Sequence, residues 1–334
     1  MSLPIIDLTP LSHPCPSPSD LLTLSAYLST AFSTTGFAYL THAPLSFTHS
    51  EIFSLAQGFF SLPNESKLSV VKKSFRSENK NTYRGYFPVQ ASGDNSKEGF
   101  EIGGKDALPQ LNKDVAKFNL NEENVWPEGF EHGRERLELL HEELQALSEK
   151  LLSLLAVALG REEGYFKGYM EDSLSTLRLL HYPANERDRA AQELCCTPHT
   201  DSGILTLLHQ DATGGLEILG VDDRWIPAPY VEGSMVVNVG DLMGMVSGGM
   251  FKATVHRVRR SGAGERFSVP FFFEPGAGCV VRSVGEGAEG AEGKGVWYGR
   301  HVLEKMRGWV EFRDEDGGDR GVGVVRGEEV VVGA

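Results

Sequence analysis

The sequence predicts a mainly β protein with flanking helices, in which a mostly helical N-terminal half packs on an all-β C-terminal half. Two features of the 334 residues predict this class. Leucines between residues 137 and 154 recur at steps of three and four, which is typical of one face of a long helix. After residue 176, short apolar or alternating runs are separated by Gly, Pro and Asp, which is typical of an antiparallel sandwich or barrel.

The N-terminal half combines short strands with helices. Its clearest helix carries the leucine stripe, and Gly160 follows that stripe at a position suited to a helix cap. Residues 74–104 are polar and rich in Gly, Ser and Asn, a composition typical of a long surface loop. The other predicted elements are strands at 3–8 and 36–40 and helices at 20–32 and 50–61.

The C-terminal half is predicted to consist of consecutive strands joined by turns. We therefore divide the chain into three regions: 1–170, with helices and strands that pack on the core; 171–312, the β core and a following helix; and 313–334, a C-terminal tail. The predicted strands are 177–182, 204–209, 216–219, 235–239, 254–258 and 267–273.

Composition limits the classes of partner. The chain carries 32 Lys and Arg against 46 Asp and Glu, a net charge of −14, which repels phosphate backbones and anionic membranes. It lacks a run of about 18 apolar residues that would span a bilayer. Its four cysteines are too few for a disulfide framework in a chain of this length. We expect a cytoplasmic protein with a small-molecule partner, no nucleic acid and no membrane; the oligomeric state is left open.

The sharpest motif is PHTDS at residues 198–202. On a strand, positions i and i+2 face the same way, so the imidazole of His199 and the carboxylate of Asp201 converge on one metal ion. A second histidine, His256, lies 55 positions after Asp201, far enough for the chain to cross a β-sandwich and return. Two histidines and one carboxylate on one side of a metal, with open positions opposite, are typical of non-haem Fe(II) oxygenases.

A second polar pair follows on the last predicted strand. Arg266 and Ser268 are again two positions apart and share one strand face. A guanidinium binds a carboxylate through two parallel hydrogen bonds, and a neighbouring hydroxyl donates a third. The pair therefore predicts a dicarboxylate ligand, with one end on the metal and the other on Arg266 and Ser268.

Two further residues are candidates for a substrate pocket. Arg178 projects from the strand that bears Tyr182, four positions earlier, so it faces the same pocket and suits a polar group of a substrate; the alternative is a surface charge. Phe272 is in phase with Arg266 and Ser268 and would form a pocket wall.

Other polar residues near these motifs receive a structural interpretation. Asn238 and Asp241 are interpreted as turn chemistry at a strand end. The adjacent Cys195 and Cys196 are interpreted as free packed thiols, with metal ligation or a redox role as the alternative.

Taken together, the motifs resemble the iron(II)- and 2-oxoglutarate-dependent oxygenases of the isopenicillin-N-synthase-like branch. The resemblance covers most of the chain, and the set of motifs is far more specific than any single one. The segments that carry it stand in the family's order: PIID at 4–7, GF at 36–37, FFSLP at 59–63, RGY at 84–86, HYP at 181–183, GGLE at 214–217, VNVGD at 237–241 and YG at 298–299.

The resemblance implies a double-stranded β-helix, or jelly roll, whose open mouth holds the metal. N-terminal helices would support its outer sheet, and residues 74–104 together with the segment after residue 295 would form a lid. The implied residues are His199, Asp201 and His256 as Fe(II) ligands, and Arg266, Ser268 and Tyr182 as contacts of 2-oxoglutarate.

The implied reaction is hydroxylation or desaturation of a small molecule in specialised metabolism or nucleobase salvage. Fe(II) is the cofactor, 2-oxoglutarate and O2 are cosubstrates, and succinate and CO2 are released. Two alternatives stay open. One is an oxidase of the same scaffold that does not use 2-oxoglutarate, and the other is a non-catalytic, cupin-like metal-binding protein.

Overall fold

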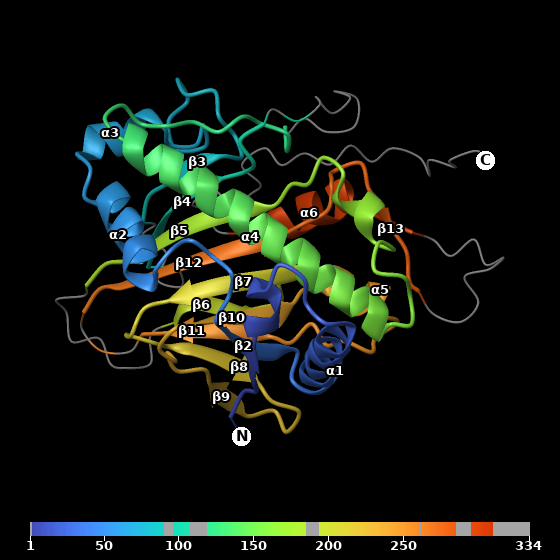
Figure 1. Cartoon of the computed structure of the whole chain (residues 1–334). Helices are drawn as coiled ribbons and strands as arrows, with labels where there is room; N and C mark the ends of the chain where they lie inside the picture. Colours follow the sequence, from blue (N-terminus) through green and yellow to red (C-terminus); the bar gives the residue numbers. More distant parts are fainter. Residues whose placement is uncertain are drawn as a thin grey trace.

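The computed structural model describes residues 2–89, 96–106, 108, 119–184, 194–260, 262, 264–284 and 295–309. The expected C-terminal tail, 313–334, lies outside the described residues. Figure 1 shows a sheet-rich body with one long helix, α4, across it.

The larger sheet has eight strands in the order β1-β2-β10-β7-β12-β5-β4-β3. Its neighbours are antiparallel except for the parallel pair β1 and β2. The strands are β1 (Ile5–Asp7), β2 (Phe37–Thr41), β3 (Gly85–Phe87), β4 (Glu98–Ile102), β5 (Thr176–Tyr182), β7 (Leu205–Gln210), β10 (Ser234–Val239) and β12 (Arg266–Phe273).

A smaller sheet, in the order β6-β11-β8-β9, packs against the larger one and gives the two-layered jelly roll that we expected. A buried cluster that includes Leu180 and Tyr182 of β5 with Ile218 and Val258 fills the space between the sheets. The remaining strands are β6 (Leu194–His199), β8 (Leu216–Leu219), β9 (Trp225–Pro227) and β11 (His256–Arg259), with the short pair β13 (Val280–Val281) and β14 (Val296–Trp297).

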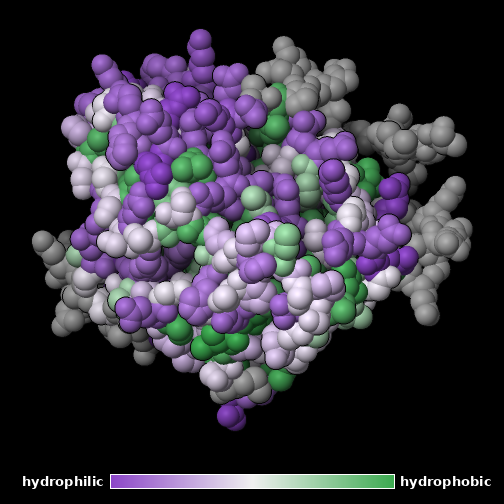
Figure 2. Space-filling view, in the orientation of Figure 1, coloured by the Kyte–Doolittle hydropathy of each residue, from purple (hydrophilic) through white to green (hydrophobic). Residues whose placement is uncertain are grey.

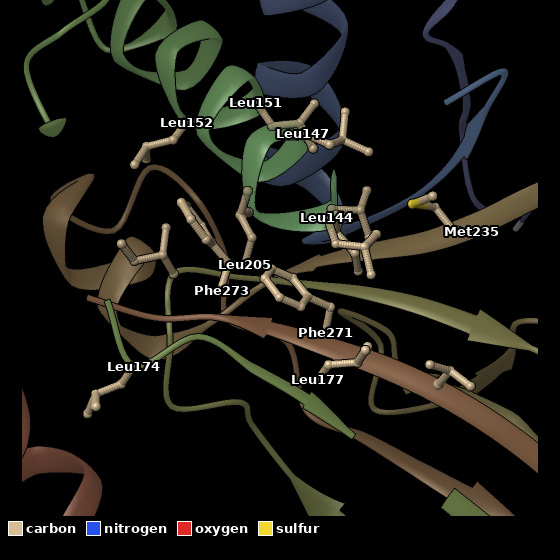
Figure 3. Packing of buried hydrophobic residues seen from close by; sticks show 14 of the residues in the cluster. Leu144, Leu147, Leu151, Leu152, Leu174, Leu177, Leu205, Met235, Phe271 and Phe273 are labelled. Atoms are coloured by element: carbon tan, nitrogen blue, oxygen red, sulfur yellow. The ribbon is translucent and has the colours of Figure 1, made fainter. Parts of the chain in front are cut away.

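Helices cover the other face of the larger sheet. Figure 3 shows Leu144, Leu147 and Leu151 of α4 packed with Phe271 and Phe273 of β12 in one buried cluster. This packing confirms the predicted leucine stripe. The helices are α1 (Pro18–Thr34), α2 (His49–Phe60), α3 (Asn64–Ser69), α4 (Glu131–Ala158), α5 (Asp241–Val246) and α6 (Tyr298–Met306), with 3-10 turns η1 (Thr9–Ser12) and η2 (Lys167–Met170).

The end of α4 is the predicted glycine cap. Gly160 has φ of +70°, a left-handed conformation that costs glycine little. The next amide, that of Arg161, donates to the Ala156 carbonyl at 2.9 Å, and this bond closes the last turn.

The expectation of a surface loop over residues 74–104 is wrong. This segment contributes β3 and β4, which complete one edge of the larger sheet, and all residues of both strands are buried. The polar composition misled because Glu98 and Glu101 are paired inside the protein with Lys67 and Lys72. Strands β1 to β4 thus share a sheet with strands of the second predicted region, and the division at residues 170 and 171 stays a prediction.

Side-chain alternation on β12 separates the core from the site. Val269, Phe271 and Phe273 belong to the cluster under α4. Arg266 and Ser268 face the opposite way, into a cavity between the two sheets. The larger sheet is therefore a platform with a helix-covered face and a face that lines the cavity.

The outer surface is mostly polar on the side drawn in Figure 2, where hydrophobic side chains form separate small patches. Among the described residues, none of the helices combines the length and the apolar composition that crossing a membrane requires.

Candidate metal centre and adjoining cavities

Three side chains meet at the end of the smaller sheet. His199 ends β6, Asp201 follows two residues later, and His256 opens β11 directly opposite His199 in the strand pairing. The Nε2 atoms of His199 and His256 lie 3.7 and 3.6 Å from Oδ1 of Asp201. In the described part of the chain, this is the one group of three or more such side chains that could hold a metal ion.

For Asp201, the spatial reason differs from the one that the sequence suggested. Asp201 lies beyond the end of β6, so its side chain is directed by the turn after the strand and not by strand alternation. For His256 the expectation is confirmed: after β6 the chain crosses to the larger sheet in β7 and β10, and β11 returns to the smaller sheet as the hydrogen-bonded neighbour of β6.

Backbone carbonyls orient both imidazoles. Nδ1 of His199 lies 2.7 Å from the Thr197 carbonyl oxygen, and Nδ1 of His256 lies 3.1 Å from that of Thr254. Each Nδ1–H therefore donates to the backbone, which directs Nε2 at Asp201 and the space between the three groups. With Nε2 unprotonated on both histidines, this donor set of two imidazoles and one carboxylate fits a divalent ion such as Fe(II).

Charge at the centre also favours a cation. Burial raises the pKa of Asp201, but His256, His199 and two hydrogen bonds outweigh it and hold that pKa below its ordinary value. Burial lowers the pKa of His256 to about 4, which keeps this imidazole neutral. Burial opposes a charge on His199 too, yet Cys196 and Asp201 raise its pKa to about 9, so a metal ion bound there displaces a proton.

Two residues that we did not predict hold the carboxylate of Asp201. Asn238 Nδ2 and Thr206 Oγ1 donate to the same oxygen, Oδ2 of Asp201, at 2.7 and 2.6 Å. The interpretation of Asn238 as turn chemistry is wrong, because it lies within β10 and is buried. An asparagine inside an otherwise apolar strand was the available signal, since a buried amide needs hydrogen-bond partners.

We expect Thr206→Val to weaken metal binding about 10- to 100-fold, the usual cost of losing a group that orients a ligand. The substitution keeps the shape and removes the hydrogen bond to Oδ2, so Asp201 loses one of its two tethers. Titration of the apoprotein with Mn(II) measures the effect. Thr206→Ser, which keeps the hydroxyl, should bind Mn(II) like the natural protein; equal affinities for all three proteins would contradict the role.

Two cavities adjoin the three side chains. The smaller, of about 80 Å³, extends between the sheets and is lined by Asp201, His199 and His256 together with Arg266, Ser268 and Tyr182. The larger, of about 470 Å³, is also lined by His199 and Asp201 and extends toward α6. The candidate ligands therefore lie at the junction of the two cavities.

Arg266 is buried at the inner end of the smaller cavity. Its Nε donates to the Gly214 carbonyl at 2.7 Å, and its Nη1 donates to Ser268 Oγ at 3.1 Å. The Tyr182 ring lies 4.7 Å from Arg266 Cζ, and the two residues are paired across β5 and β12. The structure thus gathers the three residues expected at 2-oxoglutarate around one guanidinium.

Arg178 and Phe272 both line the larger cavity, with Arg178 Cζ 5.2 Å from the Phe272 ring centroid. Arg178 is paired with buried Glu101, which is itself paired with Lys72. Arg178 is therefore not a surface charge, and a buried chain of ion pairs holds it at the cavity wall.

Several lining residues were not anticipated as site residues. Lys97 Nζ donates to Cys196 Sγ at 3.3 Å; burial alone would raise the pKa of this thiol, but Lys97 and His199 lower it to about 6. Lys305 of α6 donates to the Thr200 carbonyl at 3.2 Å, which connects that helix to the segment between His199 and Asp201. These residues lie in segments that are distant in the sequence, so no sequence pattern could show that they line one cavity. Tyr83, Glu274 and Trp309 also line the larger cavity.

Comparison with known families places this arrangement. The model of the 2OG-Fe(II) oxygenase superfamily matches residues 173–275, and that of the N-terminal region of non-haem dioxygenase in morphine synthesis matches residues 3–129. A homoarginine-6-hydroxylase of Oryza sativa subsp. japonica is 30% identical over 326 residues, which cover 91% of this chain and 96% of that protein. The chain belongs to the 2OG-Fe(II) oxygenase superfamily.

Other relatives of the oxygenase agree. The 2-oxoglutarate-Fe(II) type oxidoreductase hxnY of Emericella nidulans is 33% identical over 237 residues, 66% of this chain and 65% of that protein. A full-length Neurospora crassa protein, solved in complex with alpha-KG (2-oxoglutarate), has a TM-score of 0.77 at 26% identity and covers 91% of this chain and 95% of its own. The same protein was also solved with thymine.

These findings confirm the expected family, fold and cofactors. The protein is an Fe(II)- and 2-oxoglutarate-dependent dioxygenase that hydroxylates or desaturates a small molecule, with O2 as the second cosubstrate.

Proposed function

We propose that His199, Asp201 and His256 are the Fe(II) ligands of this dioxygenase. One observation carries the proposal: the three donor groups meet where two cavities join, so that a metal ion there would be reached from both. Asn238 and Thr206 occupy Oδ2 of Asp201, which leaves Oδ1 for the metal. The ion would thus be held from one side, and its open positions would face the cavities.

Arg266 and Ser268 are proposed to bind the distal carboxylate of 2-oxoglutarate, with Tyr182 beside it. Arg266 is buried and is held by Gly214 and Ser268, so its remaining N–H groups are preorganised for an anion. When bound, Fe(II) would couple two reactions: the oxidative decarboxylation of 2-oxoglutarate by O2 and the oxidation of a substrate C–H bond. The chain's own residues supply orientation of the cosubstrate and exclusion of water.

The larger cavity is proposed to bind the substrate, with Arg178 contacting a polar group and Phe272 forming a wall. Both residues line this cavity next to His199. The named relatives act on or bind small polar molecules: homoarginine is hydroxylated by one, and thymine is bound by another. We propose that this enzyme also oxidises a small polar metabolite, in specialised metabolism and in the cytoplasm. All four cysteines lie in the part of the chain that the structure describes, and none of them forms a disulfide there, as a reducing compartment would keep them.

The test is a screen for substrate-dependent succinate formation by the Fe(II)-loaded enzyme. We expect a compound that is oxidised in proportion to the succinate released. Product without succinate would instead indicate an oxidase that does not use 2-oxoglutarate. Absence of the visible band that 2-oxoglutarate chelation gives in an anaerobic, folded, Fe(II)-loaded sample would contradict the assigned site.

A further inference from the structure

A buried carboxylate forms part of the wall of the larger cavity. Glu274 follows β12 directly, two positions after Phe272, and is 3% exposed. It lines the same cavity as Arg178 and the candidate metal ligands. The functions proposed so far give this group no role.

The hydrogen bonds of Glu274 are unevenly divided between its two oxygens. Oε1 accepts from the Tyr298 hydroxyl at 2.5 Å and from Ser202 Oγ at 3.4 Å. Oε2 accepts from Thr176 Oγ1 at 3.3 Å. That hydroxyl has a single proton, and it also lies 3.0 Å from the Leu174 carbonyl oxygen, a closer acceptor. Oε2 therefore shares one long hydrogen bond, whereas an ionised carboxylate oxygen accepts about two.

The pKa of Glu274 also indicates that its carboxylate is poorly solvated. Burial raises the pKa of Glu274 to about 7, although Tyr298 and Arg84 act to lower it. Arg84 does not reach the carboxylate directly, because its Nη1 donates to Thr176 Oγ1 at 2.6 Å and its Nη2 to the Leu174 carbonyl. A donor that entered the cavity and bonded to Oε2 would complete the solvation of this group.

We propose that Glu274 accepts a hydrogen bond from an N–H group of the substrate, which makes the substrate a cyclic amide, an imide or a similar N–H-bearing compound. The inference rests on the proposed use of the larger cavity for substrate. Arg178 supplies the complementary donor for a carbonyl oxygen.

The strand register sets the spacing of these two groups. Phe272 of β12 pairs with Thr176 of β5, and Arg178 and Glu274 lie on the same sheet face to either side of that pair. Their levels on the sheet are four residues apart, about 13 Å at 3.3 Å per residue. Two long side chains and one small ring lying over Phe272 span such a distance.

A purely structural role for Glu274 predicts something different. Through Tyr298, Glu274 also connects α6 to β12. Tyr298→Phe removes that connection and leaves the carboxylate. In Glu274→Gln, the amide oxygen stays with the Tyr298 hydroxyl, so the amide NH2 replaces Oε2 and presents a donor to the cavity.

The experiment uses the full chain loaded with Mn(II) and 2-oxoglutarate. Binding of each of these to the protein is first measured by titration. The probes are matched pairs: δ-valerolactam with δ-valerolactone, 2-pyridone with 2-pyranone, and thymine with 1,3-dimethylthymine. Broadening of ligand proton signals by Mn(II) reports binding beside the metal. We expect at least one N–H compound to bind about tenfold or more tightly than its partner, since a buried acceptor without a donor is costly. Glu274→Gln should remove this preference, and Tyr298→Phe should keep it.

Each other outcome overturns the inference. It fails if no N–H compound binds, if partners without N–H bind equally well, or if Glu274→Gln keeps the preference. It also fails if Tyr298→Phe removes the preference as Glu274→Gln does, because Glu274 would then act only through α6. Failure of the proposed function itself would appear in the initial titrations, because the natural protein would then not bind Mn(II) or 2-oxoglutarate.

Discussion

His256→Ala is expected to abolish Fe(II) binding and turnover together. His256 supplies one of the three donor groups that the described residues bring together at the centre, and its Nε2 is directed at Oδ1 of Asp201 by the bond from Nδ1 to the Thr254 carbonyl. Alanine leaves one imidazole and one carboxylate, which cannot hold the ion from one side as three groups do. We expect metal affinity to fall by more than about 100-fold, beyond the usual effect of losing a group that only orients a ligand.

Anaerobic titration with Fe(II), repeated with Mn(II), measures this loss separately from activity. His209→Leu is the matched control, since His209 is also buried and lies on β7, outside the lining of both cavities. That variant should bind both ions like the natural protein. A folded His256→Ala protein with unchanged affinity for Mn(II) would show that the ligand set is wrong.

Arg266→Lys is expected to keep Fe(II) and to weaken 2-oxoglutarate about 10- to 100-fold, the range that corresponds to losing a hydrogen bond between charged groups. Arg266 holds its position through Nε on Gly214 and Nη1 on Ser268 and has further N–H groups for a carboxylate. Lysine keeps the charge but has a single nitrogen, so it cannot both keep these bonds and bind a carboxylate with two parallel ones.

The dissociation constant of 2-oxoglutarate, measured on the Mn(II)-loaded protein, checks this prediction. Arg257→Lys is the control, because Arg257 is paired with Glu217 on the smaller sheet and does not line either cavity. Arg257→Lys should leave the dissociation constants of the metal ion and of 2-oxoglutarate unchanged. If Arg266→Lys also leaves 2-oxoglutarate binding unchanged, another group binds the distal carboxylate.

Site residues that share one strand could be predicted from sequence patterns, whereas residues that depend on contacts between distant segments could not. Arg266, Ser268 and Phe272 were predictable because alternation along one strand places them on one face, whatever the rest of the fold does. Asn238 and Thr206 lie on β10 and β7, and each becomes meaningful only when its strand lies beside Asp201. Glu274 likewise depends on Thr176 and Tyr298, which lie 98 and 24 positions away in the chain.

By itself, the sequence determined the helix with the leucine stripe and most strands of the jelly roll, and it predicted the residues that are proposed to bind the metal and the carboxylate. These properties are local, because side-chain periodicity and ligand chemistry act over a few residues. The tertiary structure alone decided that β11 lies beside β6 so that His256 faces His199, and that residues 74–104 supply two buried strands. Strand pairing joins segments that are distant in the chain, and its register is set by the hydrophobic packing of the whole fold.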